Sequence, residues 1–112
     1  MITLRETQSR IEADPQHWSV YLMDFVDDFR YYQDVAAIAE PIKLTGDRMD
    51  ALLASTAELG LKTPDWLVVV PPCQTPWFVS GLENLKAIAL AESPLPFRWR
   101  KIFVTEGFLS RV

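Results

Sequence analysis

The sequence predicts a mainly α protein, a single small helical domain of about five helices with proline-rich connections. Three observations support this prediction. Apolar side chains recur at three- and four-residue spacing in several segments, which is the period of an α-helix. Prolines and isolated glycines fall at the ends of these segments or between them. The chain has 112 residues, of which 49% are hydrophobic and 23% charged, a composition typical of one globular domain.

The first strong helix signal begins at Asp14. Residues 1–12 mix charges with a few aliphatic side chains, so they fit either a short helix or a flexible, loosely packed N-terminal arm. Asp14 can cap a helix whose first residue is Pro15, because the N–H that proline lacks would be unpaired at that position. An apolar stripe follows at helical spacing, consisting of Trp18, Tyr21, Leu22, Phe25, Phe29 and Tyr32.

Two more helices are predicted before residue 60. A short one covers Asp34–Ala39 and ends before Pro41, since the residue preceding a proline avoids the helical region. Residues 41–46 read as a loop. The next helix covers Asp47–Leu59, and Gly60 is its predicted C-terminal stop.

The proline-punctuated span that follows leaves two geometries open. Thr63-Pro64-Asp65 is typical of a helix start. Three consecutive valines in Trp66–Val70 would suit a buried strand, whereas the flanking prolines favour a short helical turn followed by irregular chain, and we favour the turn.

A capping box predicts the next helix. Ser80 and Glu83 have the spacing at which each side chain can accept a hydrogen bond from the other's backbone N–H. The apolar residues from Leu82 to Ala91 predict that this helix is central, together with the Trp18–Tyr32 helix, and Ser93-Pro94 ends it. Thr105 begins a brief terminal turn.

The stretch PFRWRKIF, residues 96–103, interleaves cations with bulky apolar side chains. It could be extended, with alternate side chains on opposite faces, or helical. In both geometries we expect the aromatic rings to point inward and the cations to point outward. The predicted partner-binding residues are Arg98, Trp99, Arg100, Lys101, Trp77 and Phe78.

Trp77 and Phe78 are included because two large aromatic residues directly precede a predicted helix. One of them, or Val79, can pack on the first helical turn as a hydrophobic staple. The other would then face elsewhere, where it could anchor a partner, since aromatic residues dominate the binding energy of many interfaces.

The charge distribution leaves three interpretations of the cations. The net charge is −4, but residues 1–60 carry five Lys and Arg against eleven Asp and Glu, whereas residues 61–112 carry six against four. The imbalance favours internal pairing of Arg98 and Arg100 with the helix that carries Asp24, Asp27 and Asp28. Binding of an acidic protein and binding of nucleic acid are the other two interpretations. A globally acidic chain is a poor non-specific nucleic-acid binder, because that affinity comes from clustered cations.

The residues that could support catalysis are few. Asp24, Asp27 and Asp28 could hold a divalent metal, but we favour a solvated face opposite the aromatic stripe, which already accounts for their spacing. His17 is the one histidine, Cys73 has no histidine near it in sequence, and the four glycines are isolated rather than arranged as a phosphate loop. We therefore predict no catalytic residue, no metal site and no cofactor.

The single cysteine excludes an internal disulfide, and no charged start leads into an apolar secretion signal. Prolines interrupt the longest uncharged stretch, residues 66–82, so no membrane-spanning helix is expected. These features predict a cytoplasmic protein without a membrane partner.

Three motifs give the chain a resemblance. They are Pro76-Trp77-Phe78, the run Glu92-Ser93-Pro94 continuing through Phe97, Arg98, Arg100, Ile102, Phe103 and Val104, and Asp28-Phe29-Arg30. The chain resembles small uncharacterised bacterial proteins that share PWF and ESPxxFRxRxIFV motifs and are often encoded beside minimal nucleotidyltransferase-like genes, as in toxin–antitoxin pairs. Lys101 departs from the polar residue that the family carries there, which leaves a ligand role at this position open.

The resemblance implies a non-enzymatic protein-binding module, the antitoxin or accessory partner in a bacterial two-gene system. The alternative is a DNA- or RNA-binding regulatory module that uses the C-terminal basic and aromatic segment. A third interpretation is a metal-dependent enzyme built on Asp24, Asp27 and Asp28.

Overall fold

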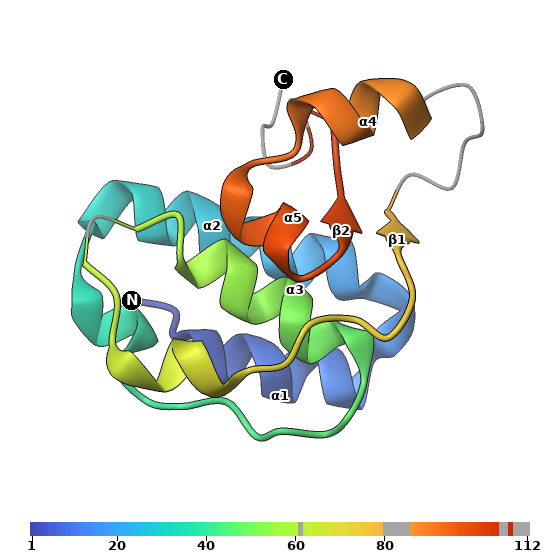
Figure 1. The fold of residues 1–112 in the computed structure, drawn as a ribbon. Helices are drawn as coiled ribbons and strands as arrows, with labels where there is room; N and C mark the ends of the chain where they lie inside the picture. The colour runs from blue at the N-terminus through green and yellow to red at the C-terminus, as the bar shows by residue number, and fades with distance from the viewer. Residues whose placement is uncertain (61, 80–85, 106–107, 109–112) are drawn as a thin grey trace.

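The first half of the chain forms three helices that cross one another (Figure 1). The computed structural model describes residues 1–60, 62–79, 86–105 and 108. Helix α1 covers Leu4–Ala13, α2 covers Trp18–Tyr32 and α3 covers Arg48–Ala57. The α1 and α2 helices pack on one another, and α1 also contacts α3. The prediction of a mainly α protein is confirmed.

Helix α1 is part of the core rather than a loose arm. The Thr3 hydroxyl accepts a hydrogen bond from the Glu6 N–H at 3.1 Å and caps the helix. The inner face carries Leu4, Thr7, Gln8 and Ile11, which are buried. The Gln8 side chain also bonds the backbone N–H and C=O of Lys43, at 2.8 and 2.7 Å. The loop 41–46 is thereby fastened to α1.

Helix α2 starts three residues later than its predicted first residue. Pro15–His17 forms a short 3₁₀ turn, η1, and the Asp14 side chain does not cap it. Within the predicted stripe, Leu22 and Phe25 are fully buried, whereas Tyr32 is half exposed at the C-terminal end. Gln33 ends the helix in the left-handed conformation, with φ +49°.

Helix α3 is the centre of the fold. Every residue from Asp50 to Ala57 is buried, and the helix lies between α1 and the C-terminal elements. Asp47 caps it by accepting the Met49 N–H at 2.9 Å, and Gly46 approaches it with φ +82°, which favours glycine. The helix ends at Ala57, two residues before the predicted end, and Gly60 has no positive φ.

The two short segments after α2 and α3 are 3₁₀ turns. η2 covers Val35–Ile38, in the predicted Asp34–Ala39 segment, and Asp34 caps it by accepting the Ala36 N–H. η3 covers Asp65–Val69. The buried-strand alternative for Trp66–Val70 is therefore wrong, and the turn exposes Val68, of which 83% is accessible. Trp66 anchors η3 through its indole N–H, which donates to the Ile38 C=O at 2.9 Å.

The remaining elements form an upper layer in Figure 1. Strand β1, Trp77–Phe78, pairs in parallel with β2, Ile102–Phe103. In the sequence, two helices connect the strands: α4, Lys86–Glu92, and α5, Leu95–Trp99. The predicted capping box at 80–83 and the staple on its first turn fall outside the described residues. Over its described part, α4 is peripheral, since Ile88 and Leu90 are about half exposed. The prediction that this helix is central is therefore wrong, and α3 takes that place.

Among the described residues, no helix is both long enough and apolar enough to span a bilayer.

Candidate functional site

The segment that carries most of the predicted site is helical. In α5, the Pro94 C=O accepts the backbone N–H groups of Phe97 and Arg98 at 3.0 and 3.1 Å. Pro94 is the N-cap and Pro96 lies in the first turn, where a missing N–H costs nothing. The extended alternative for this stretch is therefore wrong up to Trp99, and Phe97 points inward and is fully buried.

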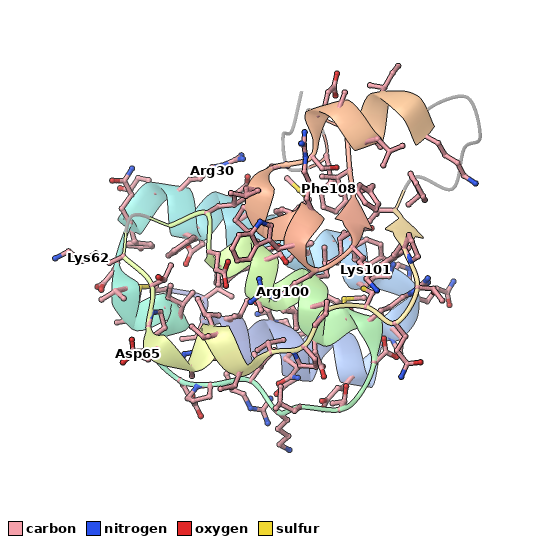
Figure 2. All side chains as sticks on the ribbon, in the orientation of Figure 1. Arg30, Lys62, Asp65, Arg100, Lys101 and Phe108 are labelled. Atoms are coloured by element: carbon pink, nitrogen blue, oxygen red, sulfur yellow. The ribbon has the colours of Figure 1, made fainter. Side chains whose placement is uncertain are left out.

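Arg100, at the C-terminal end of α5, is inside the protein. It is 7% exposed, and Figure 2 shows its side chain running from the upper layer toward α3 and η3. The guanidinium donates to Glu58 Oε1 at 2.7 Å and to the Leu67 C=O at 2.8 Å, and more weakly to the Val70 C=O. These hydrogen bonds replace the contacts with water that the charged guanidinium loses when it is buried.

Trp99 and Arg100 therefore reverse the expected arrangement of rings inward and cations outward. Trp99 is 75% exposed, and Leu95, four residues earlier on the same helix face, is 61% exposed. We call these two residues the α5 face. Because Phe97 and Arg100 occupy the inner side of the short helix, Trp99 and Leu95 are held on the outer side.

Arg98 remains at the surface, but its guanidinium already has a structural role. It donates from Nε to the Ser93 C=O at 2.6 Å and from Nη2 to the Ala91 C=O. Both carbonyls belong to the C-terminal end of α4, where unpaired acceptors and the helix dipole favour a cation. Arg98 thus caps α4 and keeps its positive charge beside the α5 face.

The other three predicted residues lie at the small sheet. Lys101 is exposed, has φ +62°, and accepts the Trp77 N–H through its backbone C=O at 2.8 Å. Trp77 is buried against Trp18 and under the Arg48 guanidinium, which lies 4.1 Å from its ring centroid. Phe78 is half-buried and stacks on Phe103. The six predicted residues therefore form two groups, one on α5 and one at the sheet.

The acidic cluster on α2 is not the carboxylate partner of Arg100, which is Glu58, the C-cap of α3. Asp28 accepts the backbone N–H of Ile2 at 2.5 Å and so fastens the N-terminus to α2. Among the described residues, no group of three or more His, Cys, Asp or Glu side chains could hold a metal ion. The structure gives the metal-dependent interpretation no site in this part of the chain.

A polar constellation at the start of α2 was not predicted. Asp14 Oδ2 accepts the Tyr21 hydroxyl at 2.7 Å and lies 2.8 Å from His17 Nδ1. The Tyr21 hydrogen bond, and then His17, hold the pKa of Asp14 below its ordinary value. The same hydrogen bond raises the pKa of Tyr21. The spacing of residues 14, 17 and 21 is the signal in the sequence for this cluster, but Tyr21 also fits the apolar stripe of α2.

Cys73 lies in a groove of 470 Å³ between the N-terminal end of α3 and residues 71–77. Burial raises the pKa of its thiol, an effect that the Arg48 charge opposes only in part. A thiol with a raised pKa is a poor nucleophile at neutral pH. The groove therefore adds no support for catalysis by Cys73.

A second groove, of 560 Å³, lies where α2 and α3 end and includes Phe29, Tyr32 and Leu59. Arg30 and Lys62 flank it. Figure 2 shows their side chains pointing away from one another, so they do not converge on a single anion.

Comparison with protein-family models, with curated proteins and with solved structures finds no match to this chain. The α5 face and the sheet are therefore interpreted from their own geometry.

Proposed function

We propose that this chain is a non-enzymatic protein-binding module that acts in the cytoplasm and binds an acidic protein through the α5 face. The observation that carries the proposal is Trp99, a large aromatic side chain that is 75% exposed on a helix anchored from within. Tryptophan and arginine dominate binding energy at protein interfaces, particularly when they are held in place before binding.

The anchoring of α5 supports preorganisation. Phe97 is fully buried in the core, and Arg100 bonds α3 and η3 from the inner side of α5. Trp99 lies between these two residues in the sequence, so its backbone position is set by both. A partner that covers Trp99 would lose little free energy to ordering the backbone beneath it.

The charge beside the α5 face supports an acidic partner. Arg98 is exposed, and it lies on the half of the chain with more cations than carboxylates. The resemblance to small bacterial proteins leads us to propose the product of an adjacent gene as this partner. This chain would then be the antitoxin or accessory component of a two-gene system.

The test is co-expression with the adjacent gene product, followed by a binding measurement on the purified pair. We expect Trp99→Ala to weaken binding by about 30-fold, the loss that removal of an interface anchor causes. The matched control is Val68→Ala, because Val68 is equally exposed but lies on η3. We expect this control to bind like the unmodified chain.

Two outcomes would contradict the proposal. One is a chain that purifies without the gene product from co-expressing cells. The other is a complex that Trp99→Ala leaves unchanged. Retention on nucleic acid that falls steeply with salt and is lost in Arg98→Ala would favour the DNA- or RNA-binding alternative.

A further inference from the structure

Among the residues that the structure describes, the small sheet has one covered edge and one open edge. On the β2 side, the Val104 N–H donates to Ser93 Oγ at 2.8 Å and the Ser93 hydroxyl reaches the Val104 C=O at 3.1 Å. The end of α4 therefore closes that edge. Strand β1 forms the other edge and lies on the outer side of β2 in Figure 1.

Phe78 carries the unpaired backbone groups of β1. The N–H groups of Trp77 and Val79, on either side of it, donate to the C=O groups of Lys101 and Phe103 on the β2 side. In a strand, the backbone groups of the residue between them point to the opposite edge. Within the described part of the chain, no hydrogen bond reaches the Phe78 N–H or C=O. Such an edge is a template for a further strand.

Cations lie on both faces of this open edge. The Arg48 guanidinium stacks on the Trp77 ring at 4.1 Å, and the Lys86 ammonium lies 5.3 Å from the Phe78 ring centroid. Because Trp77 and Phe78 are consecutive in a strand, their rings point to opposite faces of the sheet. In Figure 2, Lys101 lies directly beside this sheet.

A carboxylate also lies beside one of these cations in the sequence. Asp47 precedes Arg48 in the sequence, and one of its oxygens accepts the Met49 N–H as the cap of α3. On a protein of net charge −4, three cations, Arg48, Lys86 and Lys101, are nevertheless brought to one small sheet. Complementary charge increases both the association rate and the specificity of binding.

We infer that the β1 edge binds an extended acidic peptide segment of a partner protein by strand addition. The Phe78 N–H and C=O would exchange hydrogen bonds with the backbone of the added strand, while acidic side chains at consecutive positions would meet the cations on the two faces. This surface is separate from the α5 face, and the inference does not depend on the function proposed above.

The test uses the full chain and the peptide acetyl-Ser-Val-Glu-Glu-Val-Ser-amide, followed by two-dimensional NMR of the backbone amides. We expect a dissociation constant of about 1 mM, with the largest shift at the Phe78 amide. In the free protein, this amide should exchange with solvent much faster than those of Trp77 and Val79.

Three controls separate strand addition from simple charge attraction. A peptide with N-methyl groups on both valines and both glutamates keeps the charges but lacks the backbone donors, so binding should be lost. The double variant Lys86→Gln/Lys101→Gln should bind about tenfold more weakly. Lys43→Gln, which removes an exposed cation from the loop before α3, should bind normally, as should Trp99→Ala.

The inference would be overturned by slow exchange of the Phe78 amide in the free protein, which would mean that the edge is already covered. Equal binding of the N-methylated peptide would overturn it too, as would the absence of any shift at Phe78 up to about 10 mM peptide. Shifts confined to α5 would assign the peptide to the other face and would equally overturn it.

Discussion

At the scale of single residues, Trp99 and Arg100 show how local acceptors decide which side chain is buried. Hydrophobicity alone would bury the tryptophan and expose the arginine. Arg100 is buried instead because Glu58, the Leu67 C=O within the η3 turn and the Val70 C=O just after it form a ready set of acceptors. None of these groups is close to Arg100 in sequence, so the pattern in residues 96–103 could not reveal the exchange.

Asp14 provides a pH-dependent prediction at the same scale. Its lowered pKa means that the stabilisation is present above the unfolded-state pKa and is lost as the pH falls through the folded-state pKa. We expect Asp14→Asn to lower the melting temperature at pH 7 by about 2 °C, because the charged acceptor of the Tyr21 hydroxyl is gone. The difference from the unmodified protein should shrink as the pH falls through the folded-state pKa of Asp14 and its carboxyl group becomes neutral.

Thermal unfolding of both proteins between pH 7 and pH 2 measures this effect. Tyr21→Phe is the control, since Asp14→Asn should have a smaller effect in that background. A difference in melting temperature that stays constant down to pH 2 would contradict the assignment of the effect to the Asp14 charge. The raised pKa of Tyr21 has the opposite sign, so its contribution is present below the unfolded-state pKa and is lost as the pH rises through the folded-state value.

At the scale of elements, Arg100 connects α5, α3 and η3. Replacing it with methionine preserves much of the packing volume but leaves the Glu58 carboxylate and the Leu67 C=O without their partner. We expect Arg100→Met to lower the free energy of unfolding by about 3 kcal/mol, as for other broken buried pairs. Urea denaturation measures the change.

Glu58→Gln serves as the comparison for Arg100→Met. Its side chain is about a quarter exposed and the amide oxygen can still accept from Arg100, so we expect a loss of about 1 kcal/mol. If Arg100→Met were as mild as a surface substitution, the buried ion pair could not be what holds α5 in place, and the preorganisation of Trp99 would lose its basis.

Much of the helical structure could be predicted because local signals specify it. Asp47 and the apolar residues of α3, Asp34 before η2, and the stripe on α2 all act within a few residues of the chain. Local signals could not show that α3, rather than α4, is the central helix, because that depends on which distant elements pack against each helix. Two strands of two residues each also carry too short a pattern to be recognised.

The candidate site, too, has features that local sequence could predict and features that depend on tertiary structure. Lys101 is exposed, as expected of a cation in this segment, whereas Trp99 is exposed against the expectation that the rings point inward. Their separation into an α5 face and a strand edge follows from the helical turn at Pro94–Trp99 and from the pairing of Trp77 with Ile102. Pairing between residues 25 positions apart in the chain depends on tertiary structure.

At the scale of the whole molecule, α1 decides whether the chain unfolds as one cooperative unit. Leu4 is fully buried in a core shared with α2 and α3, at the very start of the first helix. We expect Leu4→Ala to lower the free energy of unfolding by about 3 kcal/mol, because it leaves a cavity in that core. Tryptophan fluorescence reports mainly on α2 and the C-terminal half, where the four tryptophans lie, whereas circular dichroism reports on all helices. Urea transitions followed by the two probes should shift together.

If residues 1–12 were a loosely packed arm, Leu4→Ala would leave the fluorescence transition in place, and that result would refute the integral role of α1.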